Sequence, residues 1–387
     1  MSLNKIRNAF SILLGSLMLF VSDSSYAELQ WNLTEGVTPI SHQIYDLHMI
    51  IVYISVIVGV GVYVMMIYSI INHRKSRNPT PATFHENTTV EVIWTIIPFV
   101  VLVALAIPAT KTLLALEDTS DADVTIQATG YQWKWKYEYL NEDISFFSAL
   151  DTRSNKIRQL NSGLDPADHV DENGKNIYLL DVDNPIVVPV NKKIRILTTS
   201  NDVIHSWWVP ELAVKRDAVP GYINESWAII EKPGVYRGQC AELCGKDHGF
   251  MPIVVIAKQE AEYNDWVAMK QQEKAAAVVA SGKTYGKDEL MTRGEAAYNT
   301  SCASCHMPTG DGIKGVFPAL KGSKIATGPV KDHLDMVING SRKNPAMTAY
   351  GTQLDNLTLA AIITYERNAW GNDTGDIVQP ADVKAAR

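Results

Sequence analysis

Long apolar runs dominate the first third of the chain. The first, AFSILLGSLMLFV, follows Lys5 and Arg7 and precedes a stretch of small residues ending at Ala27, which is the arrangement of a cleaved signal peptide. An uncleaved membrane helix is the alternative, but the run is shorter than the roughly 20 residues that a bilayer requires. We therefore expect residues 1–27 to be a signal peptide and the mature chain to start near Glu28.

Two longer apolar runs, Leu47 to Ile71 and Val92 to Leu116, are each long enough to cross a bilayer. Almost no charge interrupts either run, which argues against a buried hairpin of a soluble protein. The loop between them carries three basic residues, Arg74, Lys75 and Arg77, and such loops stay in the cytoplasm. We expect a transmembrane hairpin at 28–118 in a bacterial inner membrane, with the rest of the chain on the periplasmic side.

From Val124 to about Ala257 the pattern changes to short alternating runs rich in Val, Ile, Tyr and Trp, separated by Gly, Pro and Asn turns. Such spacing predicts an antiparallel sandwich or barrel, which we place at 119–259. The segment 141–175 is polar and irregular, so we expect a partly mobile insertion between strands.

The last part of the chain is helical in character and shows no internal repeat. Residues 260–286 predict one helix, Glu260 to Ala280, followed by the linker SGKTYG. We expect a further, all-α domain at 287–387.

Composition changes this picture through the cysteines. The chain has four, and all lie in two tight pairs followed by a histidine, in CAELCGKDHGFM from Cys240 and CASCH from Cys302. In an exported protein such pairs often form disulfides, and either pair is also compatible with zinc. The first motif adds His248 and Met251 to its thiols, and this soft set favours copper. Since a single blue copper needs one cysteine, Cys240 and Cys244 can instead bridge two coppers.

A further imidazole for this copper site stands at His205 in NDVIHSWWVP, on the loop after the predicted strand KIRILTTS. A cupredoxin-like sandwich would supply its histidine ligand at such a position. A zinc site and a disulfide remain the alternatives.

The second motif, CxxCH, is the attachment signature of c-type haem. Cys302 and Cys305 would form thioethers with the haem vinyl groups, and His306 would bind the iron. The sixth ligand is expected to be Met347, in a proline-containing loop before the last helix, rather than Met336, whose spacing suggests packing in a helix core. Zinc binding or a redox disulfide is the alternative.

Several of these motifs together resemble subunit II of the haem-copper cytochrome c oxidases, from about Leu29 to Trp266. The resemblance rests on five segments in the same order as in that family: VEVIWTIIP, GYQWKWKY, HSWWVPEL, KRDAVPGYINE and PGVYRGQCAELCGKDHGFMPI. The C-terminal loop and helix resemble those of class I cytochromes c. The expected fold is a multidomain membrane protein with a two-helix transmembrane hairpin, an all-β cupredoxin-like Greek-key domain and an all-α cytochrome c domain.

This resemblance implies roles for individual residues. The dinuclear copper centre CuA would be held by His205, Cys240, Cys244, His248, Met251 and the backbone carbonyl of Glu242. The Glu242 side chain would also reach a magnesium ion at the interface with subunit I, with a solvated loop charge as the alternative. Glu91 matches the glutamate near the mouth of a proton path, although it is also compatible with a simple boundary charge.

The aromatic run GYQWKWKY raises a separate question. Its alternation sends Trp133 and Trp135 to the same face of a predicted strand, where core packing would account for both. The resemblance instead implies that Trp133 is the residue through which electrons enter.

The resemblance thus implies a subunit that relays electrons from a c-type haem through CuA to haem in subunit I, where oxygen is reduced and protons are translocated. Its partners would be subunit I, subunit III and a donor cytochrome or other periplasmic carrier, with no nucleic acid. A stand-alone membrane carrier and a nitrous oxide reductase-like protein are the alternatives. The latter needs a histidine-rich catalytic copper domain, which nine scattered histidines do not provide. The net charge of −7 does not identify the donor, because steering depends on local patches.

Overall fold

The structure is a computed structural model that describes residues 32–80, 82–159, 162–344 and 347–387. The chain divides into two units, Met1–Thr34 and Glu35–Arg387, and the described helices and strands all belong to the second. The predicted signal peptide at 1–27 lies outside the described residues. The domain boundaries given above stay predictions.

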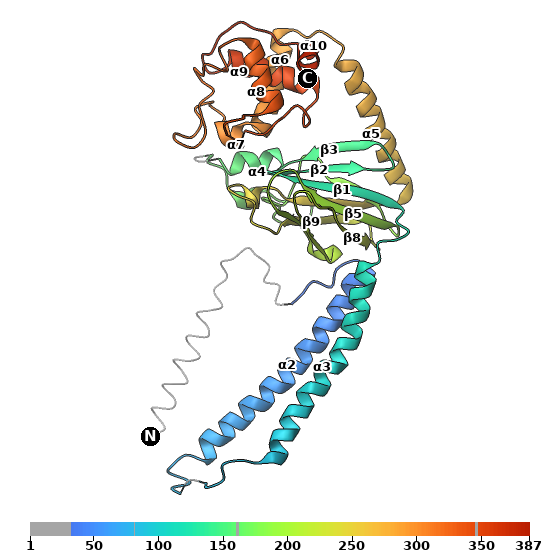
Figure 1. The fold of residues 1–387 in the computed structure, drawn as a ribbon, viewed down its shortest axis with the longest axis vertical. Helices are drawn as coiled ribbons and strands as arrows, with labels where there is room; N and C mark the ends of the chain where they lie inside the picture. Colours follow the sequence, from blue (N-terminus) through green and yellow to red (C-terminus); the bar gives the residue numbers. More distant parts are fainter. Residues whose placement is uncertain (1–31, 81, 160–161, 345–346) are drawn as a thin grey trace. The chain divides into compact units, whose positions relative to one another are not determined.

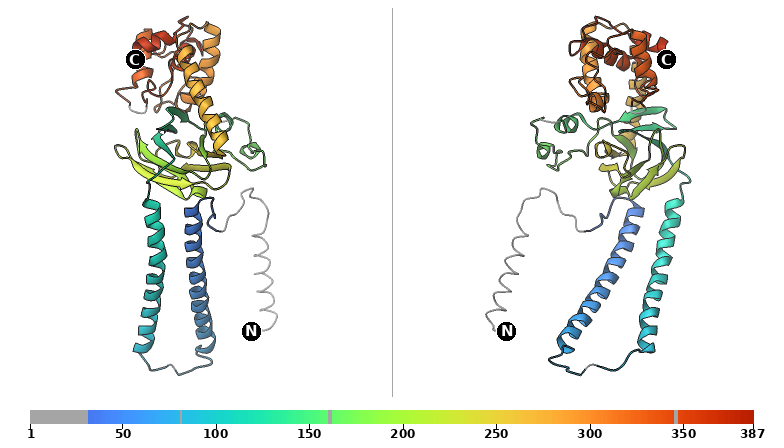
Figure 2. Two further views of the ribbon diagram at one scale, coloured as in Figure 1. Left: turned by 90° about the vertical axis from the view of Figure 1, so that its right-hand side faces the viewer. Right: turned by 60° about the vertical axis from the view of Figure 1, so that its left-hand side comes forward.

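The two predicted membrane helices are present and extend beyond the apolar runs. They are α2 (Pro39–Asn72) and α3 (Thr88–Glu117), which form a hairpin (Figure 2). The Thr38 hydroxyl caps α2 by accepting from the Ser41 amide at 3.0 Å, and Asn87 caps α3 in the same way. In both helices the most apolar stretch has a mean hydropathy of 2.6 and is unburied within the protein, as expected of helices that cross a membrane.

The β domain is a sandwich (Figure 1). Within the described residues its strands form two five-stranded sheets, ordered β3-β2-β1-β5-β8 and β4-β10-β9-β6-β7. Neighbours are antiparallel except for the parallel pairs β1 with β5 and β4 with β10. The strands are β1 (Val124–Tyr131), β2 (Lys134–Tyr139), β3 (Ile144–Ser148), β4 (Ile186–Pro189), β5 (Lys193–Ser200), β6 (His205–Val209), β7 (Val214–Ala218), β8 (Asn224–Ile229), β9 (Gly234–Cys240) and β10 (Ile253–Lys258).

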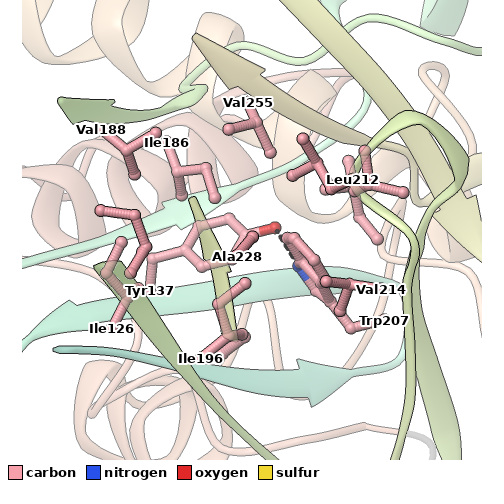
Figure 3. Packing of buried hydrophobic residues seen from close by; sticks show 14 of the residues in the cluster. Ile126, Tyr137, Ile186, Val188, Ile196, Trp207, Leu212, Val214, Ala228 and Val255 are labelled. Carbon is pink, nitrogen blue, oxygen red and sulfur yellow. Dashed lines mark hydrogen bonds between the residues drawn. The ribbon is translucent and has the colours of Figure 1, made fainter. Parts of the chain in front are cut away.

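Alternating side chains of these strands fill the space between the sheets (Figure 3). In β5, KIRILTTS, every second residue is buried, as a strand with one face on the core requires. Tyr137 and Trp207 meet across the core, where the indole Nε1 donates to the tyrosine hydroxyl at 3.2 Å. The predicted cupredoxin-like sandwich is therefore confirmed.

Two local predictions are wrong. The segment 141–175 is not wholly irregular, because strand β3 pairs with β2 and a short helix, α4 (Thr152–Ile157), follows it. The run GYQWKWKY is not one strand either, since Trp133 lies in the turn between β1 and β2. The alternation that placed Trp133 and Trp135 on one face is broken by this turn, and only Trp135 is fully buried.

The predicted helix α5 (Glu260–Ala280) follows β10 and packs on the sandwich, where the Trp266 ring lies 5.2 Å from that of Tyr139. After it come the helices of the all-α domain, α6 (Lys287–Ser301), α7 (Ala303–His306), α8 (Val330–Asn339), α9 (Asn356–Asn368) and α10 (Pro380–Ala386). Helices α6 and α9 approach closely because Gly294 has no side chain, and a methyl group there would collide with the Ala361 carbonyl. The predicted helical domain is thus present.

Candidate metal centre and haem site

Donor atoms from three parts of the sandwich converge beside its core. His205 begins β6, Cys240 ends β9, and Cys244, His248 and Met251 lie in the loop before β10. Cys244 Sγ lies 3.5 Å from both His248 Nδ1 and Met251 Sδ, and Cys240 Sγ lies 3.9 Å from His205 Nδ1 and 3.4 Å from the Glu242 carbonyl. Ligands about 2.3 Å from one tetrahedral ion lie about 3.8 Å apart, so the spacing suits shared metal ions.

The two thiols do not form a disulfide, because their sulfur atoms are 3.9 Å apart whereas an S–S bond is about 2.05 Å long. A hydrogen bond from Cys244, helped by His205, lowers the pKa of Cys240 to about 3 against the opposing effect of burial. The same hydrogen bond and burial raise the pKa of Cys244 far above its ordinary value. One proton therefore leaves the pair readily, while the second leaves only when a cation compensates the charge. This donor set fits copper, with its thioether and two imidazoles.

His205 is fully buried, and a carboxylate holds its ring on the side opposite the thiols. Its Nε2 lies 2.8 Å from Asp202 Oδ1, and a carboxylate can only accept, so Nε2 carries the proton and Nδ1 faces the thiols. Burial would lower the pKa of His205, but the hydrogen bonds to Asp202 and Cys240 outweigh it and raise that pKa. Asp202 was missed by the sequence analysis, although its place three residues before a candidate ligand is a usable signal.

The approach of β1 to His205 gives a testable constraint. A methyl group at Gly130 would lie 2.6 Å from His205 Cδ2 and 2.8 Å from Cγ, closer than real contacts allow. We expect Gly130→Ala to displace the imidazole, to lower the copper-to-haem ratio of the purified protein and to change the copper EPR spectrum. Gly249→Ala, in the ligand loop itself, is the control because its methyl group meets no atom of the described part of the chain within 4 Å. Equal copper ratios and spectra in both variants would contradict this account of His205.

The remaining predicted residues lie in different surroundings. Trp133 is half-buried, and its Nε1 donates to the carbonyl of Cys244 at 3.2 Å. Gln132, which the sequence analysis missed, donates to the same carbonyl at 2.8 Å. The Glu242 side chain is exposed, and Glu91 lies exposed in the first turn of α3, far along the chain from the copper ligands. The structure brings Trp133 to the donor cluster and leaves the roles of Glu91 and of the Glu242 side chain as predictions.

The CxxCH motif borders a cavity of about 220 Å³ in the helical domain. His306 is buried and its Nδ1 donates to the Pro318 carbonyl at 2.8 Å, which leaves Nε2 as the metal-binding nitrogen. Burial raises the pKa of both Cys302 and Cys305, so these thiols stay neutral. Two thiols and an oriented imidazole at the edge of one cavity fit the covalent attachment of a haem.

Both candidate methionines line this cavity. Met336 is half-buried on α8, and Met347 is half-buried in the loop before α9. The expectation that Met336 is a core residue is therefore wrong, because its side chain faces the cavity. The choice of Met347 stays a prediction.

A buried pair that the sequence analysis missed also lines the cavity. His333 Nε2 lies 2.8 Å from Glu366 Oε2, and the two side chains are 2% and 4% exposed. They come from α8 and α9, 33 residues apart, and no short motif signals them.

Contacts link the loop of candidate copper ligands to the CxxCH segment. Lys246 Nζ donates to the Ser304 carbonyl at 3.3 Å, and it lies 5.4 Å from the Trp133 ring and 5.8 Å from the Phe317 ring. Lys246 stands two residues after Cys244, and Ser304 lies between Cys302 and Cys305. The two cysteine motifs are therefore neighbours within the unit Glu35–Arg387.

Family models match three successive ranges of the chain. The model described as cytochrome c oxidase subunit II, periplasmic domain, matches residues 124–258, and that for the transmembrane domain of the same subunit matches 26–112. The model described as cytochrome c oxidase, cbb3-type, subunit III, matches 289–365.

Known proteins similar to this chain carry related names. A probable cytochrome c oxidase subunit 2 from Rickettsia bellii is 40% identical over 267 residues, which cover 67% of this chain and 93% of the relative. One from Rickettsia felis is 39% identical over 261 residues, or 66% of this chain and 77% of the relative. The solved periplasmic domain of subunit II of cytochrome oxidase from Bradyrhizobium japonicum is 40% identical and covers 40% of this chain and 98% of its own, with a TM-score of 0.34.

Proposed function

Because the chain belongs to the cytochrome c oxidase subunit II family and carries a cytochrome c domain, we propose that it relays electrons from a covalently bound haem c to a dinuclear copper centre and on to subunit I. The chain is a subunit of a haem-copper oxidase, and the chemistry on oxygen would take place in subunit I. One observation carries the proposal: the copper donor cluster and the CxxCH cavity lie in one chain and are joined by Lys246 and Trp133.

The copper centre would be held by His205, Cys240, Cys244, His248, Met251 and the carbonyl of Glu242. Bound there, copper supplies one-electron transfer without the making or breaking of substrate bonds. The residues of the chain hold this site rigid, because Asp202 fixes the ring of His205 and Trp135 Nε1 donates to the Met251 carbonyl at 3.3 Å. A rigid site favours electron transfer, since its ligands move little when the charge changes.

The haem would be joined covalently to Cys302 and Cys305, with His306 and Met347 as iron ligands. The Pro318 carbonyl orients His306, and the imidazole ring of His306 is buried. This haem would receive electrons from a donor cytochrome or another periplasmic carrier.

The membrane hairpin supports a place in a bacterial inner membrane, with both redox domains on the periplasmic side. Subunit I, and with it subunit III, would be the partners in the assembled oxidase. At the interface with subunit I the Glu242 carboxylate would bind magnesium, and Glu91 would lie near the mouth of a proton path that serves proton translocation.

The path between the redox centres can be tested at Trp133. Laser-triggered reduction of the haem in the purified oxidase should be followed by transfer to copper, and Trp133→Ala should slow this step by about tenfold or more, or about 1.4 kcal/mol in activation free energy. The physical reason is that the indole bridges to the Cys244 carbonyl, while the copper ligands themselves are unchanged. Trp133→Phe keeps an aromatic ring but lacks the N–H, so its transfer rate should lie between those of the parent and of Trp133→Ala.

The matched control is Trp208→Ala, which removes another half-buried tryptophan of the sandwich, on β6. This variant should transfer at the parent rate. If Trp133→Ala also ran at the parent rate with an intact copper spectrum, electrons would enter elsewhere. A purified chain that lacks copper or haem, or that does not co-purify with a large haem-containing subunit, would overturn the relay itself.

A further inference from the structure

The loop of copper ligands is contacted by a residue that does not belong to it but to the segment 141–175. Arg158 follows α4, and its Nη1 lies 3.2 Å from Asp247 Oδ2. Asp247 directly precedes the expected ligand His248. The Arg158 and Asp247 side chains are only 11% and 7% exposed, so this ion pair is shielded from water.

Arg158 makes a second contact with the same loop. Its guanidinium carbon lies 4.5 Å from the centre of the Phe250 ring, within the range of a cation–π interaction. Phe250 stands between His248 and Met251, and its amide donates to the Asp247 carbonyl at 2.9 Å. One guanidinium therefore holds the loop on both sides of His248.

Arg158 is itself held by residues that do not belong to the ligand loop. Its Nε donates to Asn155 Oδ1 at 2.8 Å on α4, which fixes the plane of the guanidinium. Helix α4 is tied in turn to the rest of the segment, since the buried Ser154 hydroxyl lies 3.0 Å from His169 Nδ1 and accepts from the Leu179 amide at 3.2 Å. The position of the guanidinium is thus determined by the folded segment and not by the ligand loop.

The charge on Asp247 is balanced by a second cation, since Lys246 Nζ lies 2.9 Å from Oδ1. Lys246 is 40% exposed and belongs to the ligand loop, so it can move with that loop. Arg158 is less exposed than Lys246, and it is held in place by residues outside the ligand loop. Loss of Arg158 would leave a nearly buried carboxylate beside the copper ligands with only Lys246 as a partner, which is more exposed and belongs to the ligand loop itself.

From these contacts we infer that Arg158 is a positioning residue of the copper centre, which acts through Asp247 and Phe250 to fix the ligand loop and to set the reduction potential of the centre. The inference rests on the proposed function, because it requires that the cluster hold copper. An unpaired carboxylate beside the centre stabilises the more positive, oxidised state. Removal of Arg158 should therefore lower the reduction potential, and neutralisation of Asp247 should raise it.

The test uses the full chain in the purified oxidase, with the midpoint potential of the copper centre and its EPR hyperfine pattern as readouts. Arg158→Gln should shift the potential downward and alter the hyperfine pattern, Asp247→Asn should shift the potential upward, and Arg158→Lys should return the potential towards the parent value. In the Asp247→Asn background, Arg158→Gln should change both readouts much less, because the carboxylate that it would leave unpaired is gone.

Arg153→Gln is the matched control. Arg153 lies on α4, the helix that Arg158 directly follows, but it is exposed and donates to the Asp168 carbonyl, away from the ligand loop. Parent-like potential and hyperfine pattern in Arg158→Gln, or equal shifts in Arg153→Gln, would overturn the inference. If Arg158→Gln fails to assemble, Asp247→Asn and Arg158→Lys still test the inference. An unchanged copper potential in Asp247→Asn would also contradict the inference. A parent protein without copper would overturn the proposed function instead, so the two failures are distinguishable.

Discussion

Replacement of Cys244 by serine is expected to abolish the dinuclear copper centre. Cys244 Sγ contacts three of the other donor atoms, at 3.5 Å from His248 Nδ1 and Met251 Sδ and 3.9 Å from Cys240 Sγ. A hydroxyl is a hard and weakly acidic ligand that cannot replace a bridging thiolate. The purified parent chain should contain two copper ions for each haem, and its mixed-valence EPR spectrum should show splitting from both copper nuclei.

In Cys244→Ser the copper content should fall and the two-nucleus splitting should disappear, while the haem spectrum stays unchanged. The control is Ser206→Ala, which alters a buried side chain next to His205. The Ser206 hydroxyl has no hydrogen-bond partner among the residues that the structure describes. This variant should keep the parent spectrum. A single-nucleus pattern in the parent, or a two-nucleus pattern that survives in Cys244→Ser, would contradict the bridging role.

The second large effect is expected at the haem. Met347→Ala should remove the thioether-to-iron absorption band and lower the haem reduction potential, because a thioether ligand stabilises ferrous iron. Visible spectra and a redox titration of the purified protein measure both quantities. The copper centre, whose ligands lie in the sandwich, should keep its EPR spectrum.

Met336→Ala is the matched variant, since both methionines are half-buried and line the same cavity. It should keep the absorption band and reduce the free energy of unfolding by less than the about 2–5 kcal/mol expected for a fully buried methionine. The reverse spectral result would assign the iron ligand to Met336.

Features that depend on a short stretch of chain could be predicted from the sequence. The apolar runs predict α2 and α3 because a bilayer selects for length and hydropathy alone. The motifs around Cys240 and Cys302 predict their chemistry because each places two cysteines and a histidine close together along the chain. The strands predicted from alternation are largely present for the same reason, since the period of a strand is local.

The errors arose where tertiary contacts override a local pattern. The alternation in GYQWKWKY continues through Trp133, yet the chain turns there, so that β2 can pair back onto β1. The polar segment 141–175 contains strand β3 because the edge of β2 offers it hydrogen-bond partners. Met336 has the spacing of a core residue, but the helix packing directs it to the cavity.

The sequence by itself therefore determined the membrane hairpin, the β and α domains and the two sets of proposed cysteine, histidine and methionine donors. Only the tertiary structure decided how those donors are held. Asp202 behind His205, Trp133 against the Cys244 carbonyl and Arg158 on Asp247 are contacts between separate elements. Arg158 and Asp247 are brought together by the packing of a segment against a loop, and no short-range pattern encodes such a pair, because the energy that forms it is distributed over the whole folded domain.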